Sequence, residues 1–252
     1  MSRTPQHIAS SSRVSVFDAV RGFSVISMVG FHLCYDLRFI WGLPLLWFAP
    51  PLQDIWRASI SWTFVFVAGC MVAWSRDNLK RSLRYLLAAL VVFVITTLAA
   101  VDVPINFGII YCMGACTLTT WLLDRIGIRP KGPLPALVFF VAFVLCLGIP
   151  HGYLGVGSFT VQIPRAFYAT PWLSWLGFPG PGFASGDYYP LLPFLLLYVA
   201  GSSVGRMLKD GNLPAWCYDS KAPALEAVGR HALPIYLLHQ PIIFLILQLL
   251  IG

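Results

Sequence analysis

The sequence predicts an all-α fold, a polytopic membrane helix bundle of about seven transmembrane helices. Hydrophobic residues make up 58% of the 252 residues and charged residues only 11%. The mean hydropathy is +0.76, and several apolar runs reach the roughly 18 residues that can cross a bilayer. The 17 Lys and Arg gather in short clusters between these runs, which is typical of proteins with several spans. We expect one domain, residues 1–252.

Each apolar run predicts one helix. The first opens with a capping-box-like Ser15-Val16-Phe17-Asp18. The sixth contains Gly201 and Gly205, a small-residue motif for helix packing. The last contains Pro234 and Pro241, which distort a helix and free backbone carbonyl groups. The predicted spans are 16–37, 55–75, 82–101, 105–124, 134–150, 190–208 and 231–251.

The placement of positive charge predicts the orientation. Fourteen of the 17 Lys and Arg lie in the N-terminal tail and first turn, or in the linkers after the second, fourth and sixth spans. The remaining three are Arg38, Arg57 and Arg165. Because cytoplasmic loops carry the excess of Lys and Arg, we expect the N-terminus inside and the C-terminus outside.

The net charge of +7 does not indicate a nucleic-acid partner. The basic residues sit at helix ends, and no polar domain is present to carry a groove-reading element. Contact with anionic lipid headgroups explains the charge. Membrane lipids are therefore expected partners, and no Cys/His spacing resembles a zinc site.

The longest outward segment, 151–189, contains ten aromatic residues and only two charged ones, Arg165 and Asp187. One interpretation is an interfacial or re-entrant segment, with its aromatic rings at headgroup level. The other is an aromatic lid over an outward-facing pocket, where rings would stack on a sugar.

A polar stripe runs along the first predicted helix. Asp18 and Arg21 are three residues apart and share a face, as an ion pair or as a grip on an anionic ligand such as a nucleotide phosphate. His32 and Asp36 are four apart and also share a face. A carboxylate beside a histidine fixes its tautomer and raises its basicity, which suits a general base. Ionisable residues within a span are functional candidates, although an interhelical polar contact would also explain them.

The last predicted helix carries a second polar group. Tyr236, His239 and Gln240 lie within one turn of each other, and His239 is a second catalytic candidate. Arg230 and His231 lie at the cytosolic rim, where phosphate binding and plain solvation are equally compatible with the sequence.

Further candidates lie elsewhere in the chain. Asn106 and Tyr111 in the fourth span are expected to line a pocket. Asp187 and Tyr188, at the outer mouth of the sixth span, are expected to contact an acceptor, or to lie on the surface.

These residues form a recognisable set. Asp18-Ala19-Val20-Arg21-Gly22-Phe23, then Phe31-His32-x-x-Tyr35-Asp36-Leu37, resembles the opening of bacterial members of the heparan-alpha-glucosaminide N-acetyltransferase-like membrane family. Three later stretches are also similar: Asn106-Phe107-Gly108-Ile109-Ile110, Asp187-Tyr188-Tyr189-Pro190-Leu191-Leu192-Pro193, and Gly229-Arg230-His231 through Tyr236-Leu237-Leu238-His239-Gln240-Pro241.

The resemblance implies a membrane acyltransferase that moves acetyl from cytosolic acetyl-CoA to a sugar or amino sugar on the outer side of a bacterial inner membrane. Acetyl-CoA would be a co-substrate, with no permanently bound cofactor. It implies CoA binding by Asp18, Arg21, Arg230 and His231. Residues 37–54 contain no histidine, and Tyr111 stands where bacterial relatives often have one, so catalysis is assigned to His32.

Other functions remain open at this point. A proton-coupled transporter or flippase for a small glycan or lipid-linked substrate would also use intramembrane His and Asp, but the sequence lacks the inverted repeat of many transporters. A non-catalytic scaffold would not need buried ionisable residues. The sequence leaves homo-oligomer formation open.

Overall fold

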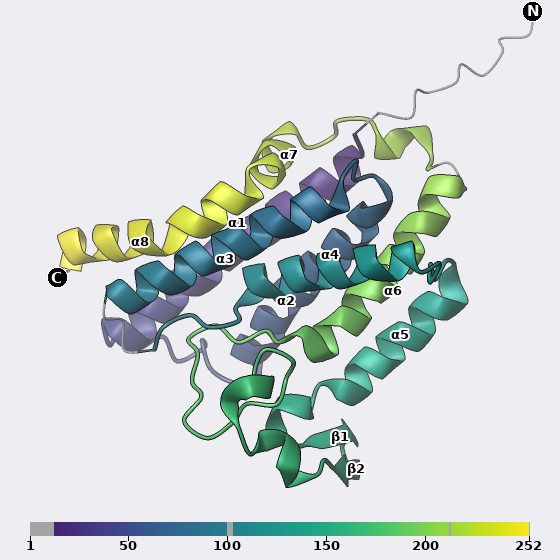
Figure 1. Ribbon diagram of the computed structural model, residues 1–252. Coiled ribbons are helices and arrows are strands. Elements are labelled where there is room, and N and C mark those ends of the chain that lie inside the picture. The colour runs from purple at the N-terminus through teal and green to yellow at the C-terminus, as the bar shows by residue number, and fades with distance from the viewer. Residues whose placement is uncertain (1–12, 100–102, 212, 252) are drawn as a thin grey trace, which may run out of the picture. The chain divides into compact units, whose positions relative to one another are not determined.

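The computed structural model describes residues 13–99, 103–211 and 213–251, and it confirms the all-α membrane fold. Eight α-helices and one two-stranded sheet make up the regular structure of these residues (Figure 1). The helices are α1 Ser15–Tyr35, α2 Leu52–Cys70, α3 Asn78–Leu98, α4 Ile109–Arg125, α5 Pro133–Cys146, α6 Leu191–Asp210, α7 Pro223–Arg230 and α8 Ala232–Ile251; the strands are β1 Tyr153–Val156 and β2 Phe159–Gln162.

Six of the helical segments in the described residues are long and apolar enough to cross a membrane. They contain α1, α2, α3, α5, α6 and α8, and they match six of the seven predicted spans. The chain is therefore an integral membrane protein. The predicted third span, 82–101, ends at residues that lie outside the described part of the chain.

The remaining predicted span corresponds to α4, which has 17 residues. It lies along α6 from end to end. The Asp187 carboxylate, just before α6, accepts a bond from the Ile109 amide at 3.0 Å. At mid-length the Thr117 and Tyr198 hydroxyls are 2.7 Å apart, and at the far end Arg206 pairs with Asp124 at 2.6 Å. Because α6 is long enough to span, α4 covers the same depth, and we count it as the seventh span.

The described residues divide into two compact units. The first unit contains residues 13–63 and 213–251, and the second contains 64–211. Helix α2 begins in the first unit and ends in the second.

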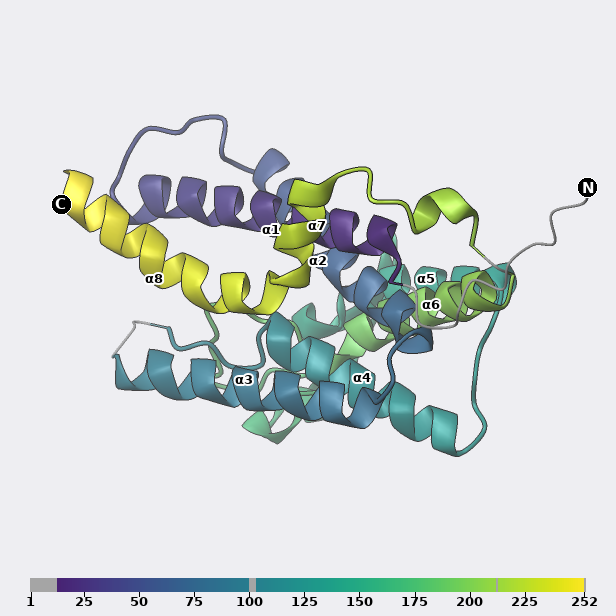
Figure 2. The same ribbon diagram turned by 90° about the horizontal axis from the view of Figure 1, so that it is seen from above.

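In the first unit, α7 crosses α1 with the two backbones in contact (Figure 2). A Cβ atom added at Gly22 would lie 1.9 Å from the Leu225 carbonyl oxygen. One added at Gly229 would lie 1.9 Å from the Asp18 carbonyl oxygen. Only glycine permits this approach, so the two glycines set how closely the helices meet.

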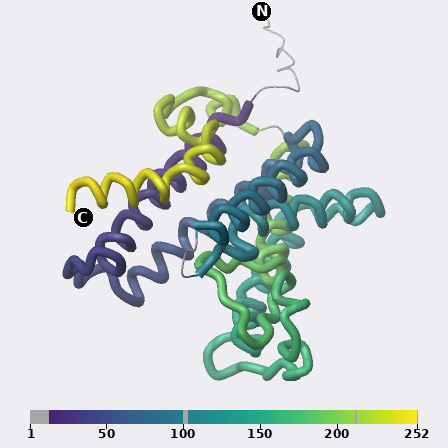
Figure 3. The backbone as a smooth tube through the Cα atoms, turned by 60° about the vertical axis from the view of Figure 1, so that its left-hand side comes forward, coloured from purple at the N-terminus to yellow at the C-terminus, as the bar shows by residue number. Residues whose placement is uncertain are grey.

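Helices α1 and α8 run in the same direction (Figure 3). Gly229, which precedes α8, lies beside Asp18 near the start of α1, and Gln240 of α8 bonds Asp36 just after α1 ends. Two parallel spans at the ends of a series require an odd number of crossings. Seven satisfies this requirement and six does not, which supports α4 as a span.

The second unit is built from two antiparallel helix pairs, α3 with α4 and α5 with α6. The Ser82 hydroxyl of α3 donates to the Gly114 carbonyl of α4 at 2.9 Å. Lys131, just before α5, pairs with Asp210 at the end of α6. The pairs thus hold the ends of their helices in register.

Four local features differ from the sequence prediction. Residues before 231 form a separate helix, α7, because Pro223 starts a helix well and His231 has non-helical angles. The first span ends in a π-helix, Asp36–Ile40. Asn106 precedes α4 instead of lying within it, since Phe107 has a positive φ of 53°. Segment 151–189 contains a β-hairpin, β1–β2.

Candidate functional site

The first unit brings the two histidine candidates together. The ring centroids of His32 on α1 and His239 on α8 are 4.8 Å apart, with the ring planes at 58°. His239 is buried and His32 is partly buried. This pairing could not be predicted from helical spacing, because the two residues are separated by nearly the whole chain.

Asp36 lies beside this pair but is held by α8. Its side chain is fully buried, and the Gln240 amide nitrogen donates to both carboxylate oxygens at 2.9 Å. No ion pair between His32 and Asp36 occurs among the described residues. The predicted orientation of His32 by Asp36 is therefore not what the geometry shows, and Gln240 takes the carboxylate instead.

The backbone explains where Asp36 points. The π-helix begins at Asp36. Such turns are rare in proteins, and many of those that occur lie at functional sites. Arg38 in the same turn donates to the carbonyls of Leu45 and Phe48, which fastens the following loop. The end of the first span is thus fixed on both sides of the buried carboxylate.

Hydrogen bonding selects the tautomer of His239. Its Nδ1 lies 2.6 Å from the Tyr236 carbonyl oxygen. A carbonyl only accepts, so Nδ1 carries the proton and, in the neutral ring, Nε2 carries the lone pair. This is the arrangement that a general base or nucleophile requires, and a backbone carbonyl supplies it instead of an acidic side chain.

The predicted Asp18–Arg21 pair is present at the start of α1, and it is part of a triad. Arg13 also contacts the buried Asp18 carboxylate, at 2.8 Å. Sequence reasoning missed Arg13 because it precedes the helix and helical spacing does not apply to it. Since Asp18 occupies both guanidinium groups, part of the Arg21 binding capacity is already used within the fold.

The predicted pair Arg230 and His231 lies at the break between α7 and α8, and both residues are exposed. Arg230 makes only a 3.9 Å contact with Glu226. Glu226 is buried and accepts mainly from the Ser220 hydroxyl, at 3.0 and 2.9 Å. The Arg230 guanidinium therefore keeps most of its donors available at the surface.

The second unit gathers the other predicted residues around the start of α4. The Asp187 carboxylate accepts from the Ile109 amide at 3.0 Å. A negative charge at this N-terminal end of α4 interacts favourably with the helix dipole. The Ser185 hydroxyl donates to the backbone carbonyl of Asn106 at 2.7 Å and accepts from the backbone N–H of Asn106 at 3.0 Å. Asp187 thus has a structural role, as a helix cap, that the sequence prediction did not include.

Two tyrosines border this junction. Tyr188 donates to the Ser174 carbonyl at 2.6 Å, and burial raises the pKa of its phenol, so it remains a donor at neutral pH. Tyr111 donates to the Trp175 carbonyl at 3.4 Å. The Tyr111 hydroxyl therefore fastens the 151–189 segment to α4, and the Tyr188 hydroxyl joins two parts of that segment. Asn106 contributes through its backbone.

Comparison with known proteins identifies the family. Residues 13–241 match the family model described as "Heparan-alpha-glucosaminide N-acetyltransferase, catalytic". No curated protein and no solved structure matches the chain. The match includes both histidines of the pair, His32 and His239, and the whole second unit. The chain therefore belongs to the family of the heparan-alpha-glucosaminide N-acetyltransferase catalytic domain, a family of membrane acetyltransferases.

Proposed function

We propose that this protein transfers an acetyl group from cytosolic acetyl-CoA to a sugar or amino sugar on the outer side of a bacterial inner membrane. The observation that carries the proposal is the contact between His32 and His239 on two membrane-spanning helices. Buried ionisable groups inside spans are costly, and this pair lies next to a buried carboxylate. Acetyl transfer needs a base, and the family of this chain is one of acetyltransferases, so a role in catalysis explains why the histidine pair is kept within the membrane.

The histidine pair would supply the base. A neutral imidazole takes the proton of the acceptor amine or hydroxyl as that group attacks the acetyl carbonyl carbon. A C–N or C–O bond forms, the C–S bond of the thioester breaks, and the proton passes to the CoA thiolate. We assign the proton transfer to His32, with His239 as its neighbour and alternative. The contact between Asp36 and Gln240 would hold the end of α1 against the middle of α8 beside the pair.

The donor would bind at the cytosolic ends of α1 and α7. Arg230 and His231 are exposed there, and guanidinium groups bind phosphate in a forked geometry. Arg21 would contribute the donors that Asp18 leaves available. This side agrees with the orientation that the placement of Lys and Arg predicts.

The acceptor would bind near Asp187 and Tyr188, with Asn106 and Tyr111 lining the pocket. A carboxylate accepts hydrogen bonds from sugar hydroxyl and amine groups, and Asp187 is the acidic residue of the 151–189 segment. Tyr236 and Gln240 would line the path on α8.

The test is acetyl transfer by the purified protein in nanodiscs, with labelled acetyl-CoA and a panel of amino sugars. Saturable acetyl-CoA binding that desulfo-CoA blocks is expected. His32→Ala should lower transfer by about 100- to 10,000-fold, the typical contribution of a general base, while acetyl-CoA binding persists. His151→Ala is the matched control, because that histidine is exposed at the end of the α5 span.

The outcomes separate the assignments. Near wild-type transfer by His32→Ala together with loss in His239→Ala would move the base to α8. Retention of transfer by both variants would refute the histidine site. Absence of acetyl-CoA binding, with substrate-dependent proton flux, would indicate a transporter.

A further inference from the structure

The β1–β2 hairpin that follows α5 has two chemically different faces. Leu154 and Val161 are directly opposite each other in the antiparallel register, so they share a face. Phe159 is two residues from Val161, and its register partner Val156 is two residues from Leu154, so both join this face. This face is entirely apolar.

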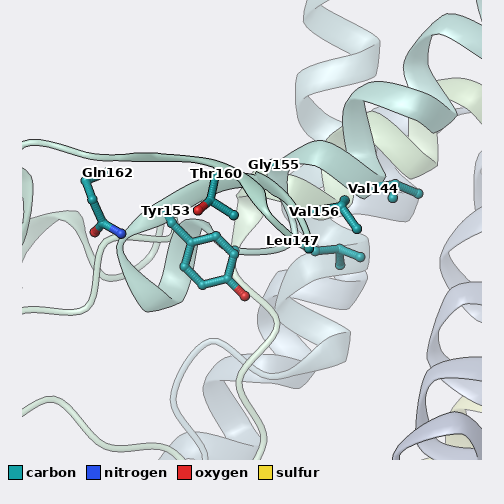
Figure 4. Close-up of a pocket in the computed structure, with 9 residues that line it drawn as sticks. Val144, Leu147, Tyr153, Gly155, Val156, Thr160 and Gln162 are labelled. Carbon is teal, nitrogen blue, oxygen red and sulfur yellow. The ribbon is translucent and has the colours of Figure 1, made fainter.

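The other face is polar and borders a groove. Tyr153 pairs with Gln162 in the register, and Thr160 lies on their side. Tyr153, Thr160 and Gln162 line an open groove of about 510 Å³ (Figure 4). Val144 of α5 and Leu147, which directly follows α5, also line it. The hairpin therefore turns its polar side chains toward a space that water can enter.

The apolar face is exposed in the protein. Phe159 is 89% exposed, Val161 70% and Leu154 38%. In an aqueous hairpin the apolar face packs on the core, whereas here every residue of β2 is exposed, including those of the apolar face. No charged residue occurs between 152 and 164. Such a face requires an apolar partner.

The position of the hairpin identifies that partner. The apolar segment that contains α5 extends from Pro133 to His151, and β1 begins two residues later, at Tyr153. The hairpin therefore starts where the span leaves the hydrocarbon. Trp172, in the same loop segment, is 82% exposed, and tryptophan is enriched at the membrane–water interface.

We propose that the apolar face of the β1–β2 hairpin lies in the bilayer, at the boundary between the headgroups and the acyl chains of the leaflet where α5 ends. The hairpin is then an interfacial anchor whose polar face and groove are turned toward water. A second copy of the chain fits this face less well, because four side chains fall far short of the roughly 800 Å² per partner that a stable dimer buries.

The experiment compares the two faces in nanodiscs by fluorine NMR. Trifluoromethyl-phenylalanine is placed at position 159 on the apolar face or, as the matched control, at the exposed position 162 on the polar face. Relaxation is measured with lipids spin-labelled near the headgroup and, separately, with a water-soluble gadolinium chelate. We expect the lipid label to relax position 159 severalfold more than the chelate does, and the reverse at position 162.

A second variant tests the cause. Val161→Asp adds a charge beside Phe159 on the same face, and it should lower the lipid-to-water relaxation ratio at position 159, while Thr160→Asp should leave the ratio unchanged. Strong relaxation of position 159 by the chelate would place this face in water and overturn the proposal. Protection of position 159 from both reagents would also overturn it, because another protein surface would then cover the face.

Discussion

Replacing Gly22 with alanine tests the crossing of α1 and α7 most directly. The new methyl group would lie 1.9 Å from the Leu225 carbonyl oxygen, and it reaches ordinary contact, 3.4 Å, only if the backbones separate by about 1.5 Å. Neither atom belongs to a flexible side chain, so a rotamer change cannot relieve the clash. We therefore take the upper end of the usual overpacking cost, about 3 kcal/mol.

The chain supplies a matched control on the same helix. A Cβ added at Gly30 meets only the Trp56 ring, at 3.7 and 3.9 Å, which is ordinary contact. Gly30→Ala should stabilise α1 by about 0.5–1 kcal/mol, because alanine favours the helix more than glycine does. The two alanine variants should therefore change stability in opposite directions.

The assay is thermal unfolding of the purified variants in one detergent. A loss of about 3 kcal/mol corresponds to a fall in Tm of about 6–12 °C for a chain of this size. Gly229→Ala should behave like Gly22→Ala, since its methyl group would meet the Asp18 carbonyl oxygen at 1.9 Å. Equal melting temperatures for Gly22→Ala and Gly30→Ala would refute the close crossing.

Three further predictions follow from the site and the helix ends. Gln240→Leu should destabilise the protein by about 3 kcal/mol because it leaves both Asp36 oxygens without the Gln240 donor. The double variant Asp36→Leu with Gln240→Leu should regain most of the wild-type Tm but none of the transfer activity. Arg230→Ala should raise the KM for acetyl-CoA and weaken its salt dependence, and the exposed Lys221→Ala in the same loop should do neither. A hydrogen bond from the Lys80 amide holds the pKa of the Asp77 carboxylate below its usual range. The stability that this cap contributes is complete above the unfolded pKa of about 3.9 and declines as the pH falls from there through the lower folded pKa. The Tm should therefore fall as the pH is lowered from 6 to 3, and Asp77→Asn should flatten this dependence in a melting series.

Arg21→Ala is a poorer test of donor binding than Arg230→Ala. Asp18 is buried and held by Arg21 together with the largely exposed Arg13. Removing one partner of a buried charge commonly costs about 3–5 kcal/mol, so a loss of acetyl-CoA binding in Arg21→Ala would be confounded by a loss of folding.

Much of the helical architecture could be predicted from the sequence. The apolar runs placed all seven spans close to the observed helices, because a bilayer imposes a minimum length and excludes charge. The close approach of α7 to Gly22 was not predicted. Periodicity describes the residues of one helix and contains no information about which helix lies opposite.

The missed features share one physical cause. The contact of Asp36 with Gln240 and the capping of α4 by Asp187 both join segments far apart in the sequence. Asp187, for example, was interpreted as a ligand contact or a surface charge, because the helix end that it caps lies 78 residues away. The pairing of His32 with His239 was hidden for the same reason.

The energetics of Asp36 favour a chemical role for the site. A buried carboxylate held by one neutral amide loses its hydration and gains no opposite charge among its described partners. Replacing such a group together with its partner by apolar residues is often neutral or stabilising, so the Asp36–Gln240 contact is not what the fold needs to be stable. It does lock α1 to α8 one turn from His32 and at the residue after His239. In an enzyme a histidine pair must keep its geometry while substrates enter from both sides of the membrane, and a directional polar contact fixes that geometry better than interchangeable apolar contacts do.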